Sequence, residues 1–135
     1  MSQPIYVFDT NIISELLRRP DARVGNLIRG HQQDRLILCE SVIYEIERGL
    51  KHRNATKQLE RFQKEVVTYF QIMPIQLADW KRAGVMWAVM RSDGRQLSDI
   101  DLLVASVAIR LGGVVVTDDR DFDQLPVQTE NWLHE

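Results

Sequence analysis

Residues 5–13 read IYVFDTNII, and this stretch decides the fold class. The β-branched and aromatic run at residues 5–8 is typical of a buried strand. It stops abruptly at Asp9, and apolar residues then recur with helical spacing over residues 12–17 until Pro20 ends the pattern. A buried strand that leads through an acid into an amphipathic helix predicts an α/β domain, and in such domains functional groups collect beyond the carboxyl ends of the strands.

The rest of the sequence alternates in the same way. Further strands are expected at residues 35–39, 73–75, 114–116 and 127–129, and further helices at about 24–28, 42–51, 55–70, 78–91 and 99–111. Ser41 and Ser98 are the expected N-caps of two of these helices. The alternation predicts a central, mostly parallel sheet covered on both faces, a three-layer α/β/α fold. Without a repeat, linker or low-complexity segment, residues 1–135 are expected to form a single domain.

Composition limits the classes of function. A hydrophobic fraction of 44% and a charged fraction of 27% are ordinary for a globular protein. The absence of a signal-peptide pattern and of an apolar run of bilayer length predicts a cytoplasmic protein without membrane contact. The single cysteine, Cys39, excludes an internal disulfide and is expected in the core. The three histidines lie far apart in sequence, which disfavours a zinc site.

The formal net charge of −2 does not favour nucleic-acid binding, but the charges are unevenly distributed. Basic residues crowd residues 48–64, where Glu60 is the only acid. Such a stretch is most often a solvated helix face, and contact with a polyanion is the less common, functional interpretation. On that interpretation the candidate RNA contacts are Arg48, Lys51, Lys57 and Arg61.

Four acids stand where an α/β sheet would place functional groups: Asp9, Glu45, Asp101 and Asp119. Each also has a structural explanation. Asp9 can cap the first helix, Glu45 and Asp101 lie near the starts of expected helices, and Asp119 lies in a polar turn.

Taken together, the four acids favour a metal site. Their neighbours are strongly apolar, and isolated carboxylates are costly to bury in such surroundings. If the four converge, two carboxylates about 4 Å apart repel by roughly 4 kcal/mol at an effective dielectric of 20. A hard divalent cation relieves that repulsion, and carboxylate oxygens without nearby His or Cys favour Mg²⁺ or Mn²⁺. Such a site can activate water for phosphodiester cleavage.

Four blocks of the sequence resemble the PIN-domain ribonucleases, and more narrowly the VapC-type toxins of bacterial toxin–antitoxin pairs. The blocks are residues 7–16, 41–46 with Gly49 beyond, 101–108 and 116–122. One block alone is a weak signal, whereas all four in order across nearly the whole chain are a strong one.

The resemblance implies a PIN-like fold and an Mg²⁺- or Mn²⁺-dependent endoribonuclease. It implies catalytic and metal-binding roles for Asp9, Glu45, Asp101 and Asp119, with Thr10, Asn11 and Thr117 as supporting polar residues. It also implies a homodimer and a cognate antitoxin whose tail blocks the acidic pocket. A FitB-like relative would add a DNA-binding antitoxin and a larger complex on operator DNA.

Two positions are ambiguous. Asp118 adjoins Asp119, and Asp119 is preferred as the fourth acid because the pattern resembles Thr-x-Asp. Asp99 and Asp101 point to different sides of a helix, and Asp101 is preferred because an apolar run follows it directly. Asp121 is expected to form the turn or to support the site without binding the metal.

Other interpretations remain open. A haloacid-dehalogenase-like phosphatase also begins with an aspartate after its first strand, but its second acid falls here on Asn11. A response-regulator receiver matches only in part. A degenerate PIN-like module that binds RNA or protein without catalysis is the alternative from another class, and four intact acids argue against it. Trp80 and Trp87 could stack on bases, but their helical spacing favours core or dimer contacts.

Overall fold

The computed structural model describes residues 3–134, and its centre is a parallel sheet with the strand order β3-β2-β1-β4-β5. All four strand pairs are parallel. The strands are β1 (Ile5–Phe8), β2 (Arg35–Cys39), β3 (Gln71–Met73), β4 (Val114–Val116) and β5 (Gln128–Glu130). The expected three-layer fold is thereby confirmed, with a sheet that is parallel throughout the described residues.

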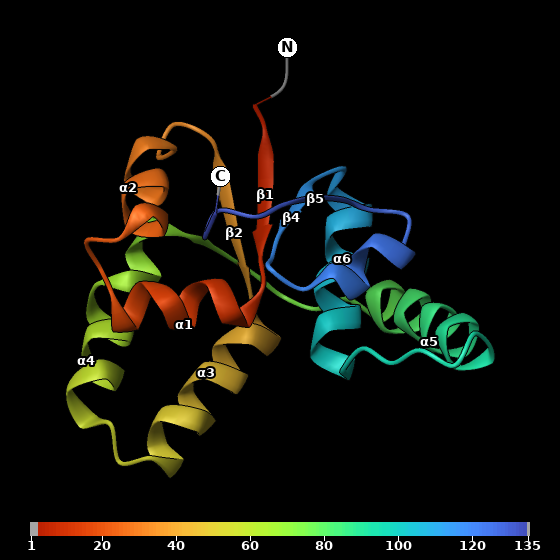
Figure 1. Ribbon diagram of the computed structural model, residues 1–135, viewed down its shortest axis with the longest axis horizontal. Helices are drawn as coiled ribbons and strands as arrows, with labels where there is room; N and C mark the ends of the chain where they lie inside the picture. Colours follow the sequence, from red (N-terminus) through yellow and green to blue (C-terminus); the bar gives the residue numbers. More distant parts are fainter. Residues whose placement is uncertain (1–2, 135) are drawn as a thin grey trace.

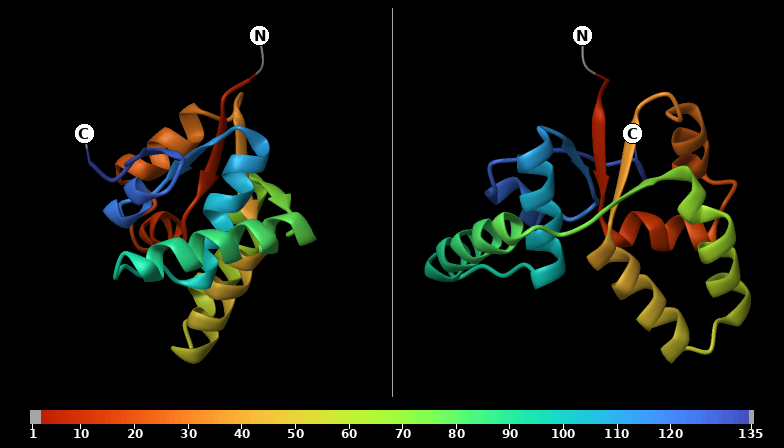
Figure 2. Two further views of the ribbon diagram at one scale, coloured as in Figure 1. Left: turned by 90° about the vertical axis from the view of Figure 1, so that its right-hand side faces the viewer. Right: turned by 180° about the vertical axis from the view of Figure 1, so that it is seen from behind.

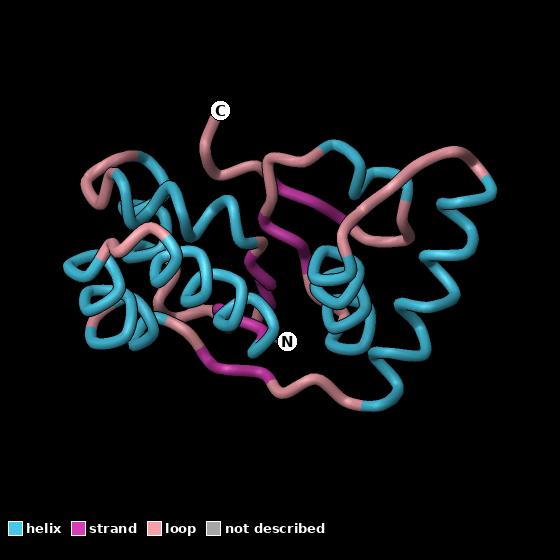
Figure 3. The backbone as a smooth tube through the Cα atoms, turned by 90° about the horizontal axis from the view of Figure 1, so that it is seen from below, coloured by secondary structure: helices cyan, strands magenta, loops and turns pink. Residues whose placement is uncertain are grey.

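Helices cover both faces of this sheet (Figures 1 and 3). One layer contains α1 (Thr10–Arg18), α2 (Arg23–Gly30), α3 (Glu40–His52) and α4 (Thr56–Lys64). The other contains α5 (Leu77–Ser92) and α6 (Asp99–Leu111), and α5 lies across the outer side of α6 (Figure 2). Two 3₁₀ helices complete the structure, η1 (Val66–Tyr69) and η2 (Arg120–Gln124).

The middle strand β1 sets the position of the functional edge. Val7 of β1 is paired in register with Ile37 of β2 and Val115 of β4, and all three side chains are fully buried. From β1 the chain builds outward through β2 and β3 and then returns to the other side for β4 and β5. An open parallel sheet offers its ligand site at the carboxyl edge beside such a reversal of strand order, which here is the edge where β1 and β4 end.

Three local expectations were wrong. The helix expected over residues 55–70 ends at Lys64, and η1 follows, because Val66, Val67 and Thr68 are β-branched residues that fit an α-helix poorly. The edge strand β3 lies at residues 71–73, so Pro74 follows it and does not interrupt it. The helix α3 begins at Glu40, two residues earlier than expected, and uses Cys39, not Ser41, as its N-cap residue.

None of the helices formed by residues 3–134 is long and apolar enough to span a bilayer.

Candidate active site

The four acids singled out in the sequence come from four different segments at the carboxyl edge of the sheet. Asp9 follows β1 directly, and Glu45 lies in the second turn of α3. Asp101 occupies the first turn of α6, which runs antiparallel to the strands and so begins at this edge (Figure 1). Asp119 lies in the turn after β4, immediately before η2.

Asp9 is held rigidly. Its carboxylate caps α1 by accepting a hydrogen bond from the backbone N–H of Thr10 at 2.8 Å. Its other oxygen accepts a hydrogen bond from the hydroxyl of Thr117 at 2.8 Å. The side chain is almost completely buried, with 2% of its residue surface exposed. The predicted helix cap and a site carboxylate are therefore the same group, and one role does not exclude the other.

Asp101 is the direct neighbour of Asp9. The two carboxyl groups lie close enough to share a hydrogen bond. Burial, followed by the charge of Asp101, raises the pKa of Asp9 to about 7, against the lowering effect of its bonds to Thr117 and Thr10. Burial is also the largest cause of the raised pKa of Asp101. Without a cation, Asp9 therefore keeps its proton between about pH 4 and pH 7, where an isolated aspartate has lost it.

Glu45 and Asp119 complete the acidic cluster around Asp101. The negative charges of both raise the pKa of the Asp101 carboxyl group. Glu45 forms an ion pair with Arg48 at 3.5 Å, so its charge is partly balanced. One oxygen of Asp119 accepts the backbone N–H of Asp121 at 2.9 Å and thereby caps η2. Asp101 is thus the residue through which all four acids interact electrostatically.

The two ambiguous pairs are separated by their surroundings. Asp119 is half-buried and acts on Asp101, whereas Asp118 is exposed and accepts a hydrogen bond from the Asn11 amide at 3.4 Å. Asp101 is partly buried against Asp9, whereas Asp99 is exposed two residues earlier on α6. The geometry therefore favours Asp119 and Asp101, the two that the sequence analysis preferred.

The supporting residues are arranged around these acids. The Thr117 hydroxyl, besides donating to Asp9, accepts the backbone N–H of Asp119 at 3.0 Å and so links the ends of β1 and β4. Asp121 is exposed and contributes its backbone N–H to Asp119. Thr10 has a buried hydroxyl oxygen without any hydrogen-bond partner among residues 3–134.

These features fit a hard divalent cation. Within residues 3–134 no three His, Cys, Asp or Glu side chains form a ready-made metal cage. Mg²⁺, however, typically uses one or two carboxylates and keeps several waters. The adjoining carboxyl groups of Asp9 and Asp101 would provide two such ligands, and Glu45 and Asp119 lie near enough to act electrostatically on Asp101. The unpartnered Thr10 oxygen, next in sequence to Asp9, is a further acceptor suited to a bound water.

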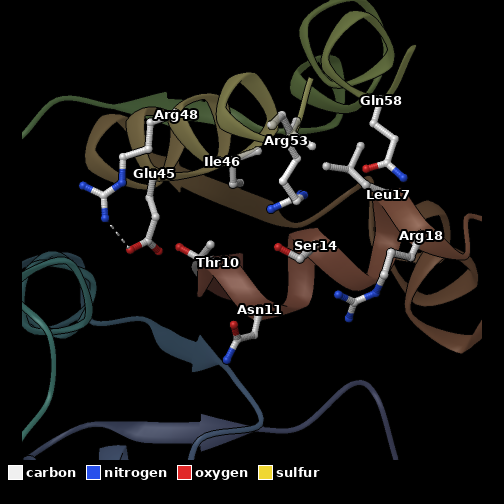
Figure 4. Close-up of a pocket in the computed structure, with 12 residues that line it drawn as sticks. Thr10, Asn11, Ser14, Leu17, Arg18, Glu45, Ile46, Arg48, Arg53 and Gln58 are labelled. Atoms are coloured by element: carbon white, nitrogen blue, oxygen red, sulfur yellow. Dashed lines mark ion pairs between the residues drawn. The ribbon is translucent and has the colours of Figure 1, made fainter. Parts of the chain in front are cut away.

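A groove leads away from the acids between α1 and α3. It encloses about 690 Å³ and is lined at one end by Thr10 and Glu45 (Figure 4). Further along, Ser14, Arg18 and Arg53 line it. The sequence analysis missed these three residues. Helical spacing could have found them, because Ser14 and Arg18 lie four apart on one face of α1 and Arg53 lies eight residues, about two turns, after Glu45.

The predicted RNA contacts are not all in this groove. Arg48 lines it beside Glu45 and lies over the ring of Tyr44. Lys51 lies on α3 within 4.0 Å of Glu47, and Lys57 lies on α4 over a different hollow. Arg61 donates hydrogen bonds to the carbonyls of Leu16 and Leu17 at 3.0 and 3.1 Å, so it stabilises the last turn of α1.

Residues 6–128 match the family described as the PIN domain. Because the match covers most of the chain, the protein belongs to the PIN domain family. No protein with a curated description matches the chain.

Solved structures with a similar fold come from several bacteria. VapBC2 from Rickettsia felis, bound to a DNA fragment from its promoter, is 21% identical, with 95% of this chain and 98% of that chain covered at a TM-score of 0.85. FitAcB from Neisseria gonorrhoeae is 23% identical, covering 97% and 100% at a TM-score of 0.79. VapC20 from Mycobacterium tuberculosis, described as a toxin that cleaves the sarcin–ricin loop, is 20% identical, covering 91% and 95% at a TM-score of 0.68.

Proposed function

We propose that this PIN-domain protein is a VapC-type endoribonuclease that hydrolyses phosphodiester bonds of RNA with the help of Mg²⁺ or Mn²⁺. The observation that carries the proposal is the carboxyl pair of the buried Asp9 and the partly buried Asp101, with Glu45 and Asp119 acting on it. A structural explanation for each acid alone does not account for two adjoining carboxyl groups, one buried and one partly buried, whose pKa values are both raised. A cation site does, because a cation makes their shared ionisation favourable.

Each residue has a definable task in this proposal. Asp9 and Asp101 would hold the cation, and Glu45 and Asp119 would add negative charge beside it. Thr117 fixes the orientation of the Asp9 carboxylate, and Thr10 holds a water with its free oxygen lone pairs. When bound, the cation lowers the pKa of a water and stabilises negative charge on the phosphodiester.

The test compares two aspartates on one helix. Asp101→Asn should abolish Mn²⁺-dependent cleavage of RNA and weaken Mn²⁺ binding measured by calorimetry. Asp99→Asn removes the same charge two residues away from an exposed position, and it should leave both quantities nearly unchanged. Cleavage by Asp101→Asn at the parent rate would overturn the proposal. Specific RNA binding without cleavage or Mn²⁺ uptake by the parent would instead favour the non-catalytic module.

The biological role proposed here is that of a cytoplasmic toxin held inactive by a cognate antitoxin. It is supported by the sequence resemblance to VapC-type toxins and by the fold shared with VapBC2 and FitAcB. A FitB-like complex of this protein with a DNA-binding antitoxin would also bind operator DNA. Expression of the parent should arrest growth, expression of Asp101→Asn should not, and co-expression of the cognate antitoxin should restore growth. Arrest by Asp101→Asn would show that the toxicity does not come from RNA cleavage.

We also propose that the protein forms a homodimer through α5. Trp80 and Trp87 were expected in the core or at a dimer contact, and they are 53% and 43% exposed. Both line a hollow of about 410 Å³ with Leu102 and Leu103 of α6. Large aromatic side chains exposed beside an apolar hollow are typical of the centre of a protein interface.

A further inference from the structure

The groove between α1 and α3 has the charge of a site for a polyanion. Three guanidinium groups line it, those of Arg18, Arg48 and Arg53, against the single carboxylate of Glu45. The groove is therefore positively charged, whereas the acidic cluster at its end and the chain as a whole, with a net charge of −2, are negatively charged. A groove that carries excess positive charge attracts phosphate groups and concentrates them near the acids.

Arg53 is the most informative of the three residues. It follows the last residue of α3, and its guanidinium passes along Gly49, where an added Cβ would lie 3.5 Å from Nη1. Figure 4 shows it reaching into the space above Ser14 of α1. Among residues 3–134 its side chain has no hydrogen bond or ion pair. An arginine aimed into a groove without a protein partner has all five of its N–H donors available for a ligand.

Arg18 and Arg48 differ from Arg53 in being paired. Arg18, on the opposite wall, lies 3.4 Å from Glu15, and its side chain is 62% exposed. Arg48 is engaged by Glu45 and by the ring of Tyr44. Because Arg18 has one partner and Arg48 has two, Arg53 and then Arg18 are the arginines of the groove most available to phosphates, one on each wall.

The dimensions fit a single strand. From Thr10 to Arg18 the helix α1 rises about 12 Å, which is roughly three nucleotides of a stacked strand. A hollow of about 690 Å³ has the size of a small-ligand pocket and is too small for a duplex. The floor contains the buried side chains of Leu17, Ile46 and Leu50, which offer phosphate neither a hydrogen-bond donor nor a positive charge. Phosphates are therefore expected to meet only the two walls.

We propose that this groove binds the sugar–phosphate backbone of single-stranded RNA beside the scissile bond, with Arg53 and Arg18 each contacting a phosphate. The inference rests on the proposed ribonuclease function and specifies its substrate as a strand that extends beyond the cleaved linkage in the direction of α4. Arg53 and Arg18 are positioning residues, because they hold the strand without touching the reacting atoms.

The binding experiment uses fluorescence anisotropy with a short labelled single-stranded RNA, in an Asp101→Asn background that prevents cleavage. Arg18→Gln together with Arg53→Gln should weaken binding at low salt by about tenfold or more. The plot of log affinity against log salt should become shallower by about 1.4 for two lost phosphate contacts.

The matched control removes the same two charges elsewhere. Lys64→Gln breaks an exposed pair with Glu60, as Arg18→Gln breaks one with Glu15, and Arg95→Gln removes a charge from the loop before α6. This control should retain the parent affinity and salt slope. Arg53→Gln alone breaks no ion pair, so it tests the proposal if Arg18→Gln proves unstable, and Arg53→Lys should restore part of the salt slope.

A cleavage experiment separates this inference from the proposed function. With Asp101 intact, the Arg18→Gln, Arg53→Gln variant should lose activity on a long RNA but cut a dinucleotide, which cannot reach the groove, at the parent rate. A parent that cuts RNA while the variant binds and cuts it equally well would overturn the groove assignment only. A parent that binds RNA without cutting it would overturn the nuclease proposal, and the binding experiment would still decide the role of the groove.

Discussion

The hydroxyl of Thr117 donates a 2.8 Å hydrogen bond to Asp9, a residue 108 positions earlier in the chain. The same oxygen accepts the backbone N–H of Asp119. One buried threonine thus fixes both the carboxylate after β1 and the turn after β4. Asp9, which follows β1, is therefore held in place by a residue that follows β4 as well as by its own segment.

Removing the Thr117 hydroxyl should loosen the site without unfolding the sheet. Thr117→Val keeps the β-branched shape but leaves the Asp119 N–H without its acceptor and Asp9 without its donor. Loss of such an orienting partner typically lowers metal affinity or activity by about 10- to 100-fold. Thr117→Ser, which keeps the hydroxyl, should behave like the parent in Mn²⁺ calorimetry and RNA cleavage. Equal losses in both variants would show that shape, not the hydrogen bond, matters.

Asp9→Asn should inactivate the protein and yet stabilise it when no metal is present. The pKa of Asp9 is raised to about 7 in the folded chain, from about 4 for an ordinary aspartate. A raised carboxyl pKa means that the metal-free parent loses stability as pH rises from about 4 to 7. The amide keeps the acceptor for Thr10 and carries no charge.

The measurement is a pair of thermal melts in EDTA. The variant should gain a few degrees over the parent above about pH 7, and the gain should vanish near pH 4. Added Mn²⁺ should raise the melting temperature of the parent and much less that of Asp9→Asn. A variant that melts below the parent at pH 8 would contradict this account.

The second buried carboxylate, Asp79, should behave oppositely. Burial alone would raise its pKa, but hydrogen bonds from Arg110 and the Gln76 N–H, with the charge of Arg82, lower it below the ordinary value. Both oxygens of Asp79 accept hydrogen bonds from Arg110 at 2.9 Å, which ties α5 to α6. Asp79→Asn should therefore destabilise the protein by on the order of 3 kcal/mol in urea unfolding at pH 7.

The pH dependence provides the check on that prediction. A lowered carboxyl pKa gives stability that is present above the ordinary value and is lost as pH falls through the folded value. The difference between parent and Asp79→Asn should thus shrink below about pH 4. A difference that is constant with pH would show that the pair contributes through packing and not through charge.

The proposed dimer predicts a change of mass in solution. Trp80→Glu and Trp87→Glu should each shift the protein to the monomer in analytical ultracentrifugation, because a charge would be buried in the contact. Val85→Glu is the control, since Val85 is also apolar and exposed on α5 but does not line the hollow between α5 and α6. A parent that sediments as a monomer at all concentrations would end the dimer proposal.

Most of the fold could be predicted because strands and helices here differ clearly in period. The strand at residues 5–8 and the strand at 35–39 were predicted with the bounds that they have. The errors occur where a local sequence pattern was compatible with two structures. The spacing of Leu59, Phe62 and Val66 is helical, but the β-branched run that follows turns the chain into η1 and then β3. Ser41 is a good cap by type, yet the helix starts earlier.

The sequence was sufficient to predict which segments of the chain come together at the candidate site. Strand ends determine where Asp9 and Asp119 lie, and a helix start determines where Asp101 lies. The basic segment was less predictable, because charge along a sequence does not say which side chains face a common surface. Arg61 looked free and is bound to the end of α1, while Arg53 lies in the groove.

The pairing of β1 with β4 has a consequence for synthesis in the cell. One of the two neighbours of β1, the strand β4, is synthesised only after α6, and Asp119 comes later still. A polypeptide released early, before residue 114, would lack that neighbour, the turn after it and the Thr117 bond to Asp9. Polypeptides that end before residue 114 are therefore expected to lack the assembled acidic site.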